Sequence, residues 1–239
     1  MGILREVLSG GAAETGIRLT ENQLDQFEKF FRMVLETNKS YNLTAIIDEK
    51  EFAVKHLVDS LTCFKAVDFK INAMVLDVGA GAGFPGIPLV IFRPDLMLTM
   101  LESTEKRVNF LNKAISGLGL NNVEAVHMRA EDFGRKKFFR DKYDIVVSRA
   151  VAPLSVLAEY CLPPLKGGGV FIAMKGPKIQ EEVKAAQNAL YVLGGAVKDI
   201  VDIQLPVTGD ERKLVVISKI KATPETYPRR AGIPAKKPL

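Results

Sequence analysis

With 239 residues the chain is long enough to bury one substantial core, and its 47% hydrophobic and 26% charged residues are the ordinary balance of a globular protein. Its formal net charge of +5 is a weak indication of an anionic partner, because many enzymes carry such an excess without binding nucleic acid. The sequence holds no apolar run of the ~20 residues that a membrane span needs and no signal-peptide pattern at its start, so we expect a cytoplasmic protein without a membrane partner.

Residues 1–68 are predicted to form an N-terminal helical extension. Thr20 suits an N-cap, and the apolar residues that follow it recur at helical spacing, namely Leu24, Phe27, Phe30, Phe31, Val34 and Leu35. A second helix is predicted from Glu49 through Val67. The polar stretch 38–44 between the two helices is expected to be an ordered loop.

Residues 69–221 change to alternating strands and helices. Short apolar runs predict strands at Met74–Val78, Leu96–Leu101, Val123–Met128, Tyr143–Val147 and Gly169–Met174. Helices are predicted between and after them near Gly86–Phe92, Thr104–Leu118, Pro153–Leu162 and Ile179–Leu193. Such alternation predicts an α/β, Rossmann-like fold with a doubly wound parallel sheet.

Two further strands are predicted at Val197–Leu205 and Lys213–Ile220, joined only by residues 206–212. A parallel connection needs a crossover of about a dozen residues or more, so this pair is predicted to be antiparallel. A mostly parallel sheet that ends in an antiparallel hairpin is typical of the methyltransferase version of the fold. An ordinary dinucleotide-binding domain lacks that ending.

A glycine-rich turn links the first predicted strand to the helix after it. Glycines alternate at positions 79, 81 and 83, and a glycine lets a ligand lie against main chain where a β-carbon would collide. The dinucleotide fingerprint needs a glycine at the position that Phe84 occupies here. We therefore expect Asp77, Gly79, Gly81 and Phe84 to border a cofactor other than a dinucleotide.

Acidic residues follow the next two predicted strands. Glu102 stands roughly 20 positions after the glycine turn, where a carboxylate accepts hydrogen bonds from ribose hydroxyls, and Ser103 and Thr104 line the same edge. Ala130 and Glu131 follow the third strand, where a carboxylate can bind the exocyclic amine of adenine. The alternative for Glu102 is a surface carboxylate that caps the helix beginning near Thr104.

The candidate substrate pocket consists of Arg149, His56, Asp59 and Lys175, and no catalytic residue is assigned outright. Arg149 follows the fourth strand, where donor and substrate should meet, although a structural ion pair is the alternative. Lys175 ends the fifth strand and is a candidate phosphate contact. His56 and Asp59 lie three positions apart on one helix face, where they border the pocket or make a hydrogen bond between domains.

Two absences narrow the chemistry that this pocket offers. The fourth strand is followed neither by the cysteine nucleophile of pyrimidine C5 methylation nor by the Asn/Asp-Pro-Pro-aromatic pattern of amine methylation. N7 of guanine needs neither group, because its in-plane lone pair carries no proton, and positioning can then supply much of the catalysis. Cys63 and Cys161 lie in apolar helical patterns and are expected in the core, so we expect neither a disulfide nor a metal site.

Basic residues gather in two places. One group, Arg135, Lys136 and Lys137, precedes the fourth strand. The other lies in a basic C-terminal tail, residues 222–239, and consists of Arg229, Arg230, Lys236 and Lys237. We expect both groups to contact nucleic acid, with a merely solvated face as the alternative.

Several ordered blocks of the chain together resemble the small-subunit ribosomal RNA methyltransferase G family, also called glucose-inhibited division protein B. The blocks that carry the resemblance cover nearly the whole chain and are residues 38–44, His56–Leu61, Leu76–Gly86 with its distinctive Phe-Pro-Gly, Ser148–Ala152, Lys175-Gly176 and Arg229–Leu239. The resemblance implies transfer of a methyl group from S-adenosylmethionine to N7 of a guanine in 16S rRNA, with that rRNA or the small ribosomal subunit as the partner.

The resemblance also implies site residues. It places donor contacts at Gly79, Phe84, Glu102 to Thr104, Ala130-Glu131 and Arg149, and it turns the basic rim and tail toward rRNA. Two other functions stay open on the residues alone, namely an NAD-dependent oxidoreductase and a non-catalytic RNA-binding module. A monomer is the expected state.

Overall fold

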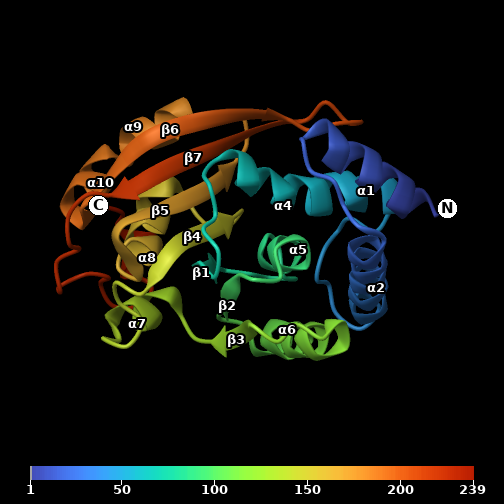
Figure 1. The fold of residues 1–239 in the computed structure, drawn as a ribbon. Coiled ribbons are helices and arrows are strands. Elements are labelled where there is room, and N and C mark those ends of the chain that lie inside the picture. The colour runs from blue at the N-terminus through green and yellow to red at the C-terminus, as the bar shows by residue number, and fades with distance from the viewer. Residues whose placement is uncertain (1) are drawn as a thin grey trace.

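A computed structural model describes residues 2–239 and contains one seven-stranded sheet in the order β3-β2-β1-β4-β5-β7-β6 (Figure 1). Its strands are β1 Met74–Val78, β2 Met97–Glu102, β3 Val123–His127, β4 Tyr143–Arg149, β5 Leu165–Lys175, β6 Gly195–Gln204 and β7 Glu211–Lys219. Strands β1 to β5 pair in parallel, whereas β7 runs antiparallel to both β5 and β6. The predicted parallel sheet and its closing antiparallel hairpin are therefore confirmed.

Helices cover both faces of the sheet (Figure 1). They are α1 Ile3–Glu14, α2 Glu21–Asn38, α3 Glu49–Phe52, α4 Asp59–Leu61, α5 Gly86–Phe92, α6 Glu105–Leu118, α7 Ala130–Arg135, α8 Leu154–Cys161, α9 Gln180–Ala185, α10 Gln187–Leu193 and α11 Ile233–Lys236. A π-helical turn, Ala53–Val58, joins α3 to α4, and a 3-10 turn, Thr62–Lys65, follows. None of the described helices is both long and apolar enough to cross a membrane.

Alternate residues of each strand enter two different apolar cores, because successive side chains of a strand point to opposite faces of the sheet. Val75 of β1 packs with the N-terminal helices, α5 and α6, whereas its neighbour Leu76 packs with α7, α8 and α10. Cys63 and Cys161 are free and buried, one in each core, as the sequence predicts. The N-terminal helices thus share a core with the sheet.

Two helical predictions need correction. The expected helix from Ile179 to Leu193 is divided at Ala186 into α9 and α10; α9 contains no fully buried residue, whereas Ile179 before it, Ala186 itself and three residues of α10 are buried. The expected helix from Glu49 to Val67 ends at Lys65 and contains the wider π-helical turn at Ala53–Val58. Single π-helical turns are frequent at functional sites, and this turn carries His56.

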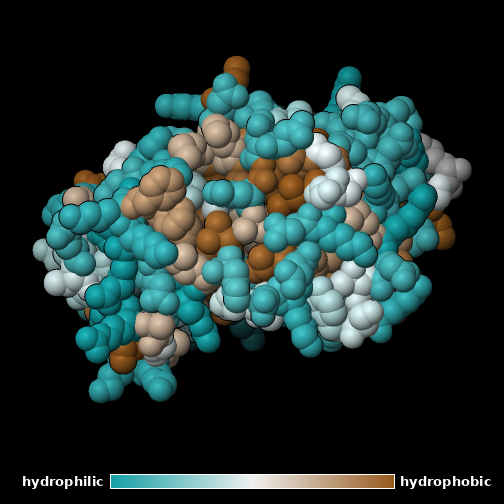
Figure 2. Space-filling view, turned by 90° about the horizontal axis from the view of Figure 1, so that it is seen from below, coloured by the Kyte–Doolittle hydropathy of each residue, from teal (hydrophilic) through white to brown (hydrophobic). Residues whose placement is uncertain are grey.

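Seen from below, apolar side chains gather near the middle of the surface, and hydrophilic side chains surround them (Figure 2). In the sheet, Val78 of β1 pairs with Leu101 of β2, and Asp77 pairs with Val147 of β4. The carboxyl ends of three neighbouring strands therefore meet at one edge. In open α/β sheets, ligands bind at this edge.

Candidate active site

The loop after β1 places three glycines in the left-handed region of backbone conformation, with φ of +76° at Gly79, +58° at Gly81 and +90° at Gly83. Residues with a β-carbon adopt this region at a cost, which accounts for the alternation in the sequence. A β-carbon added at Gly81 would find only the carbonyl oxygen of Gly79, at 3.9 Å. The loop therefore exposes bare main chain to open space at Gly81.

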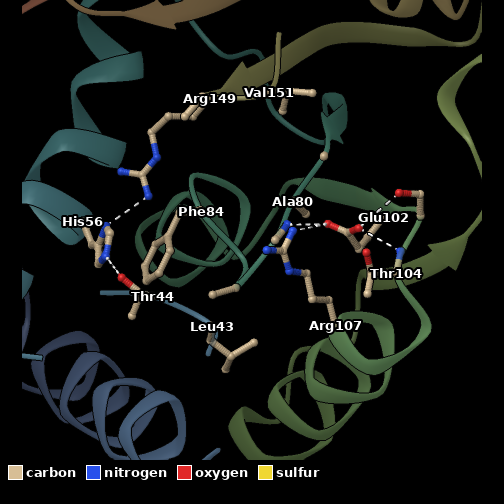
Figure 3. Close-up of a pocket in the computed structure, with 15 residues that line it drawn as sticks. Leu43, Thr44, His56, Ala80, Phe84, Glu102, Thr104, Arg107, Arg149 and Val151 are labelled. Carbon is tan, nitrogen blue, oxygen red and sulfur yellow. Dashed lines mark hydrogen bonds and ion pairs between the residues drawn. The ribbon is translucent and has the colours of Figure 1, made fainter. Parts of the chain in front are cut away.

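Glu102, at the end of β2, ties this loop to the next strand. Its Oε2 accepts a hydrogen bond from the Gly81 N–H at 3.0 Å, and its Oε1 accepts one from the Thr104 N–H at 2.8 Å (Figure 3). The side chain of Glu102 is only 5% exposed, and the guanidinium of Arg107 lies 3.7 Å from Oε2. Glu102 is thus not the surface carboxylate of the alternative: it is buried, it binds the N–H of the residue before α6, and it faces the cavity described next.

A cavity of about 360 Å³, here called the central cavity, opens beside the glycine loop (Figure 3). It brings together seven of the ten residues expected to contact the cofactor, namely Gly79, Gly81, Phe84, Glu102, Ser103, Thr104 and Arg149. Its lining also includes Leu43, Thr44, Arg107 and Val151, which the sequence did not single out. The position of Leu43 and Thr44 is set by Asn38, whose Oδ1 accepts hydrogen bonds from both backbone N–H groups.

Asp77 is not brought to this cavity. Its side chain is fully buried beneath the loop, where Oδ2 accepts a hydrogen bond from the Gly86 N–H at 2.9 Å. Burial raises the pKa of Asp77 to about 7, against the opposing effects of that N–H and of Arg149. Asp77 therefore supports the start of α5, and the expected direct contact with a cofactor does not fit its position.

Ala130 and Glu131 line a second cavity of about 250 Å³, here called the tail-side cavity. It shares Gly79, Ser103 and Val151 with the central cavity, so the two form one crevice along the ends of β1, β2 and β4. The Glu131 Oε1 accepts a hydrogen bond from the Gly232 N–H at 2.8 Å. No pattern in the sequence indicates that contact.

A third cavity of about 380 Å³, here called the basic cavity, adjoins the central one on its other side. All four candidates for the substrate pocket line it, namely His56, Asp59, Arg149 and Lys175. Lys55 and Arg212 add two more cations, and Arg212 comes from β7, far along the chain. His56, Arg149 and Ala150 line both this cavity and the central one.

Arg149 makes the hydrogen bonds that join the residues between the central and basic cavities. Its Nη1 donates to Asp59 Oδ2 at 3.0 Å and to the carbonyl oxygen of Lys55 at 3.1 Å. Its Nη2 lies 3.1 Å from Nδ1 of His56 (Figure 3). Arg149 therefore forms the ion pair that was the alternative reading, and it also lies where the central and basic cavities meet.

His56 is held in one tautomer by these neighbours. A guanidinium can only donate, so His56 Nδ1 accepts from Arg149, and Nε2 carries the hydrogen that is donated to Thr44 Oγ1 at 2.8 Å. The imidazole also stacks on Phe84, with ring centroids 4.4 Å apart. Burial, and then the charge of Arg149, lower the pKa of His56 to about 3, so the ring is neutral.

Asp59 and Lys175, the other two candidates for the substrate pocket, are already paired with neighbouring groups. Burial raises the pKa of Asp59, while Arg149 and Arg212, whose Nε lies 3.6 Å from Asp59 Oδ1, oppose that shift. Lys175 Nζ donates to Glu182 Oε1 at 2.6 Å and to the carbonyl oxygen of Ala152 at 2.7 Å. Lys175 thus joins β5 to α9 and the loop after β4.

The basic residues expected to contact RNA fall into two groups. Six of them are exposed, namely Arg135, Lys136, Lys137, Arg230, Lys236 and Lys237. Arg229 is held by Glu159, with Nη2 donating to Oε2 at 2.6 Å. Its guanidinium is therefore part of an ion pair within the fold.

The sheet order, the closing hairpin and the crevice at the strand ends define a class I S-adenosylmethionine-dependent methyltransferase fold. A SAM-dependent methyltransferase from Aquifex aeolicus has a similar structure, with a TM-score of 0.50 at 21% identity over 66% of this chain and 88% of that chain. A SAM-dependent O-methyltransferase from Thermotoga maritima has a TM-score of 0.52 at 16% identity over 70% of this chain and 66% of that chain. At such identities the likeness shows the fold alone.

Sequence comparison shows the family. The model of the family described as rRNA small subunit methyltransferase G matches residues 23–215. The ribosomal RNA small subunit methyltransferase G of Desulforamulus reducens is 57% identical over the full length of both chains, and that of Alkaliphilus metalliredigens is 48% identical over 98% of each. The chain belongs to the rRNA small subunit methyltransferase G family. Membership of the family confirms the resemblance seen in the sequence, and with it the methyltransferase class and its cofactor S-adenosylmethionine.

Proposed function

We propose that this chain transfers a methyl group from S-adenosylmethionine to N7 of a guanine in 16S rRNA. The observation that carries the proposal is the shared wall of His56 and Arg149 between the central cavity, beside the glycine loop, and the basic cavity. A donor held on one side of this wall and a nucleotide held on the other would meet at Arg149. Such a substrate places the enzyme in the cytoplasm.

The crevice fits an adenosyl compound. Gly81 offers bare main chain, and Gly79 lines both cavities beside Val151. Glu102 to Thr104 stand where ribose hydroxyls would lie, and Ala130 and Glu131 lie at the far end for the adenine. Phe84 and Arg149 close the end that would receive the methionine part. When bound there, the sulfonium supplies an electrophilic methyl group.

The basic cavity fits a nucleotide. Lys55, Arg149, Lys175 and Arg212 surround it, and such cations neutralise the phosphates of a bound strand. Asp59 is the only carboxylate in the described lining of this cavity, and two guanidinium groups flank it. Carboxylates behind the lining, such as Glu51 beside Lys55 and Glu182 beside Lys175, balance part of this charge, and a phosphate that enters would compete with them for the cations.

The titratable groups around these cavities favour an acceptor that has no proton to lose. His56 is neutral, with Nδ1 occupied by Arg149, and Asp59 is engaged with arginines. Both Glu102 oxygens accept backbone hydrogen bonds. N7 of guanine suits such a site, because its in-plane lone pair attacks without a general base and catalysis can come from holding the reactants in line.

Labelled methyl transfer tests the proposal. Unmodified 16S rRNA and small ribosomal subunits would be incubated with methyl-labelled S-adenosylmethionine, and the product RNA would then be cleaved chemically at N7-methylguanine. We expect label to enter one of the two substrates and cleavage to fall at a single guanine. Label at another atom, or no label in either substrate, would overturn the assignment.

A further inference from the structure

The C-terminal segment, residues 222–239, is fixed against the body of the protein. The Arg229 backbone N–H donates to Glu159 Oε1 at 2.7 Å, and its guanidinium grips both oxygens of the same carboxylate, which is 1% exposed. Arg140 Nη1 donates to the carbonyl oxygen of Tyr227 at 2.6 Å. Pro228 is buried against Gly134, where an added β-carbon would lie only 3.0 Å from it. The segment is therefore docked on α7 and α8.

The docked segment reaches the crevice. Gly232 donates its N–H to Glu131, and Ala235 lines the tail-side cavity together with Gly79 and Ser103. Tyr160 of α8 also lines this cavity, and its hydroxyl lies 3.4 Å from Glu131 Oε1. One wall of the crevice thus comes from a part of the chain about a hundred residues away from Glu131.

We propose that residues 222–239 form the outer wall of the adenine-binding part of the donor site, so that affinity for adenosyl compounds depends on the docking of this segment. The proposal rests on the donor site proposed above. The Gly232 N–H holds Oε1 of Glu131 and so orients the carboxylate, which leaves Oε2 to meet the exocyclic amine of adenine. Ala235 shields the ring from water, and a site that buries most of a ligand binds it more tightly.

The charges explain why the docked position is the resting one. Glu131 and Glu159 are 4% and 1% exposed, and the segment supplies both with N–H donors. If the segment moved away, both carboxylates would exchange these donors for water, and Glu159 would lose its charge-assisted, bidentate pair with Arg229, which is stronger than hydrogen bonds between neutral groups. The wall is thus present before the donor binds, and a bound adenine reinforces it.

Replacing each of two alanines of the segment by phenylalanine tests whether the segment forms this wall. Ala231 and Ala235 are both exposed residues of the segment, but Ala235 lines the tail-side cavity and Ala231 does not. We expect Ala235→Phe to weaken S-adenosylhomocysteine binding, measured by calorimetry, by about tenfold or more, and Ala231→Phe to leave it within about twofold. Equal affinities of the two variants, whether both weakened or both unchanged, would overturn the proposal.

Hydrogen–deuterium exchange provides a second measurement on the unaltered chain. We expect saturating S-adenosylhomocysteine to slow exchange of the amides in residues 229–239, Gly232 among them, because the bound ligand holds the segment in place. Unchanged exchange in that stretch would contradict the proposal even if Ala235→Phe failed to fold.

Failure of this proposal can be told apart from failure of the donor site itself. Gly81→Ala places a methyl group in the central cavity, away from the segment. If Gly81→Ala abolishes binding while Ala235→Phe does not change it, only the role of the segment is wrong. If neither substitution changes binding, the donor lies elsewhere and both proposals fail.

Discussion

Arg149 Nη1 lies 3.0 Å from Asp59 Oδ2, although 90 positions separate the two residues along the chain. The side chains are 15% and 4% exposed, so the ion pair is shielded from water. The pair fixes the end of β4 against the start of α4 and holds the guanidinium that also contacts His56. The wall between the central and basic cavities therefore depends on it.

Removal of Asp59 tests how far the fold depends on this pair. We expect Asp59→Ala to lower the free energy of unfolding by roughly 3 kcal/mol, because it leaves a buried guanidinium without its counter-ion. Asp202→Ala is the matched control, since it removes a 74% exposed partner of Lys213, and it should cost under about 1 kcal/mol. Urea denaturation measures both. A loss for Asp59→Ala no larger than for the control would show that the pair adds nothing to stability.

Gly81→Ala tests the donor site against a backbone control. Gly81 and Gly119 have φ of +58° and +66°, and an added β-carbon contacts nothing closer than 3.9 Å at either position. Both alanine variants should lose roughly 1–2 kcal/mol of stability from the left-handed backbone. Only Gly81→Ala should also weaken S-adenosylhomocysteine binding, by about tenfold or more in calorimetry. Equal affinities in the two variants would remove Gly81 from the site.

The lowered pKa of His56 predicts a pH dependence of stability. The pKa is about 3 in the folded chain and about 6.5 when unfolded, so below pH 6.5 the unfolded chain binds a proton that the folded chain does not. The contribution of His56 to the free energy of unfolding is complete above pH 6.5 and is lost as the pH falls toward 3. Roughly 2 kcal/mol of it is lost by pH 5.

Urea denaturation between pH 7.5 and 5 measures this effect. The stability advantage of the unaltered chain over His56→Gln should shrink as the pH falls. His127→Gln, at the other histidine, which is exposed, serves as the control. An advantage over His56→Gln that stays constant across this range would show that His56 is not buried as a neutral group.

Salt dependence tests which cations face RNA. Neutralising Arg230, Lys236 and Lys237 should lower the slope of log affinity against log salt by about 2, since each lost phosphate contact removes roughly 0.7–0.9. The set of Arg135, Lys136 and Lys137 should be neutralised in a separate variant, so that the two surfaces are compared. A slope that does not change excludes the surface concerned from the RNA interface. Arg229 is left out of both sets because it holds Glu159, and Arg229→Gln should lower stability instead.

The order of strands and helices could be predicted because each depends on a local pattern. Strands buried on both faces are continuous apolar runs, and the seven residues between the last two predicted strands allow only an antiparallel pair. The break of the helix at Ala186 could not be predicted from the pattern, because apolar residues continue at helical spacing from Val183 to Leu190, and these two residues pack against the same core. The predicted sheet topology was therefore correct, and the prediction of one continuous helix from Ile179 to Leu193 was wrong.

The candidate site was predicted in its glycine loop and acidic residues, but their neighbours were not. Asp77 belongs to the same motif as Gly79, yet it lies under the loop, because its side chain caps the start of α5. Arg212 and Ala235 line the cavities from distant parts of the chain. Nothing near Arg212 in the sequence indicates a site, and the basic tail that contains Ala235 was expected to contact RNA and not to border a cofactor site.

Local conformations follow from residues close together in the chain, such as the left-handed turns that only glycine adopts without strain and the apolar periods that bury a strand or a helix face. The tertiary structure decided which distant groups meet, including Glu131 with Gly232, which lie 101 positions apart. The reason is physical: steric limits and periodicity act over a few neighbouring residues, whereas a buried charge takes whichever partner the packing of the whole chain brings within reach.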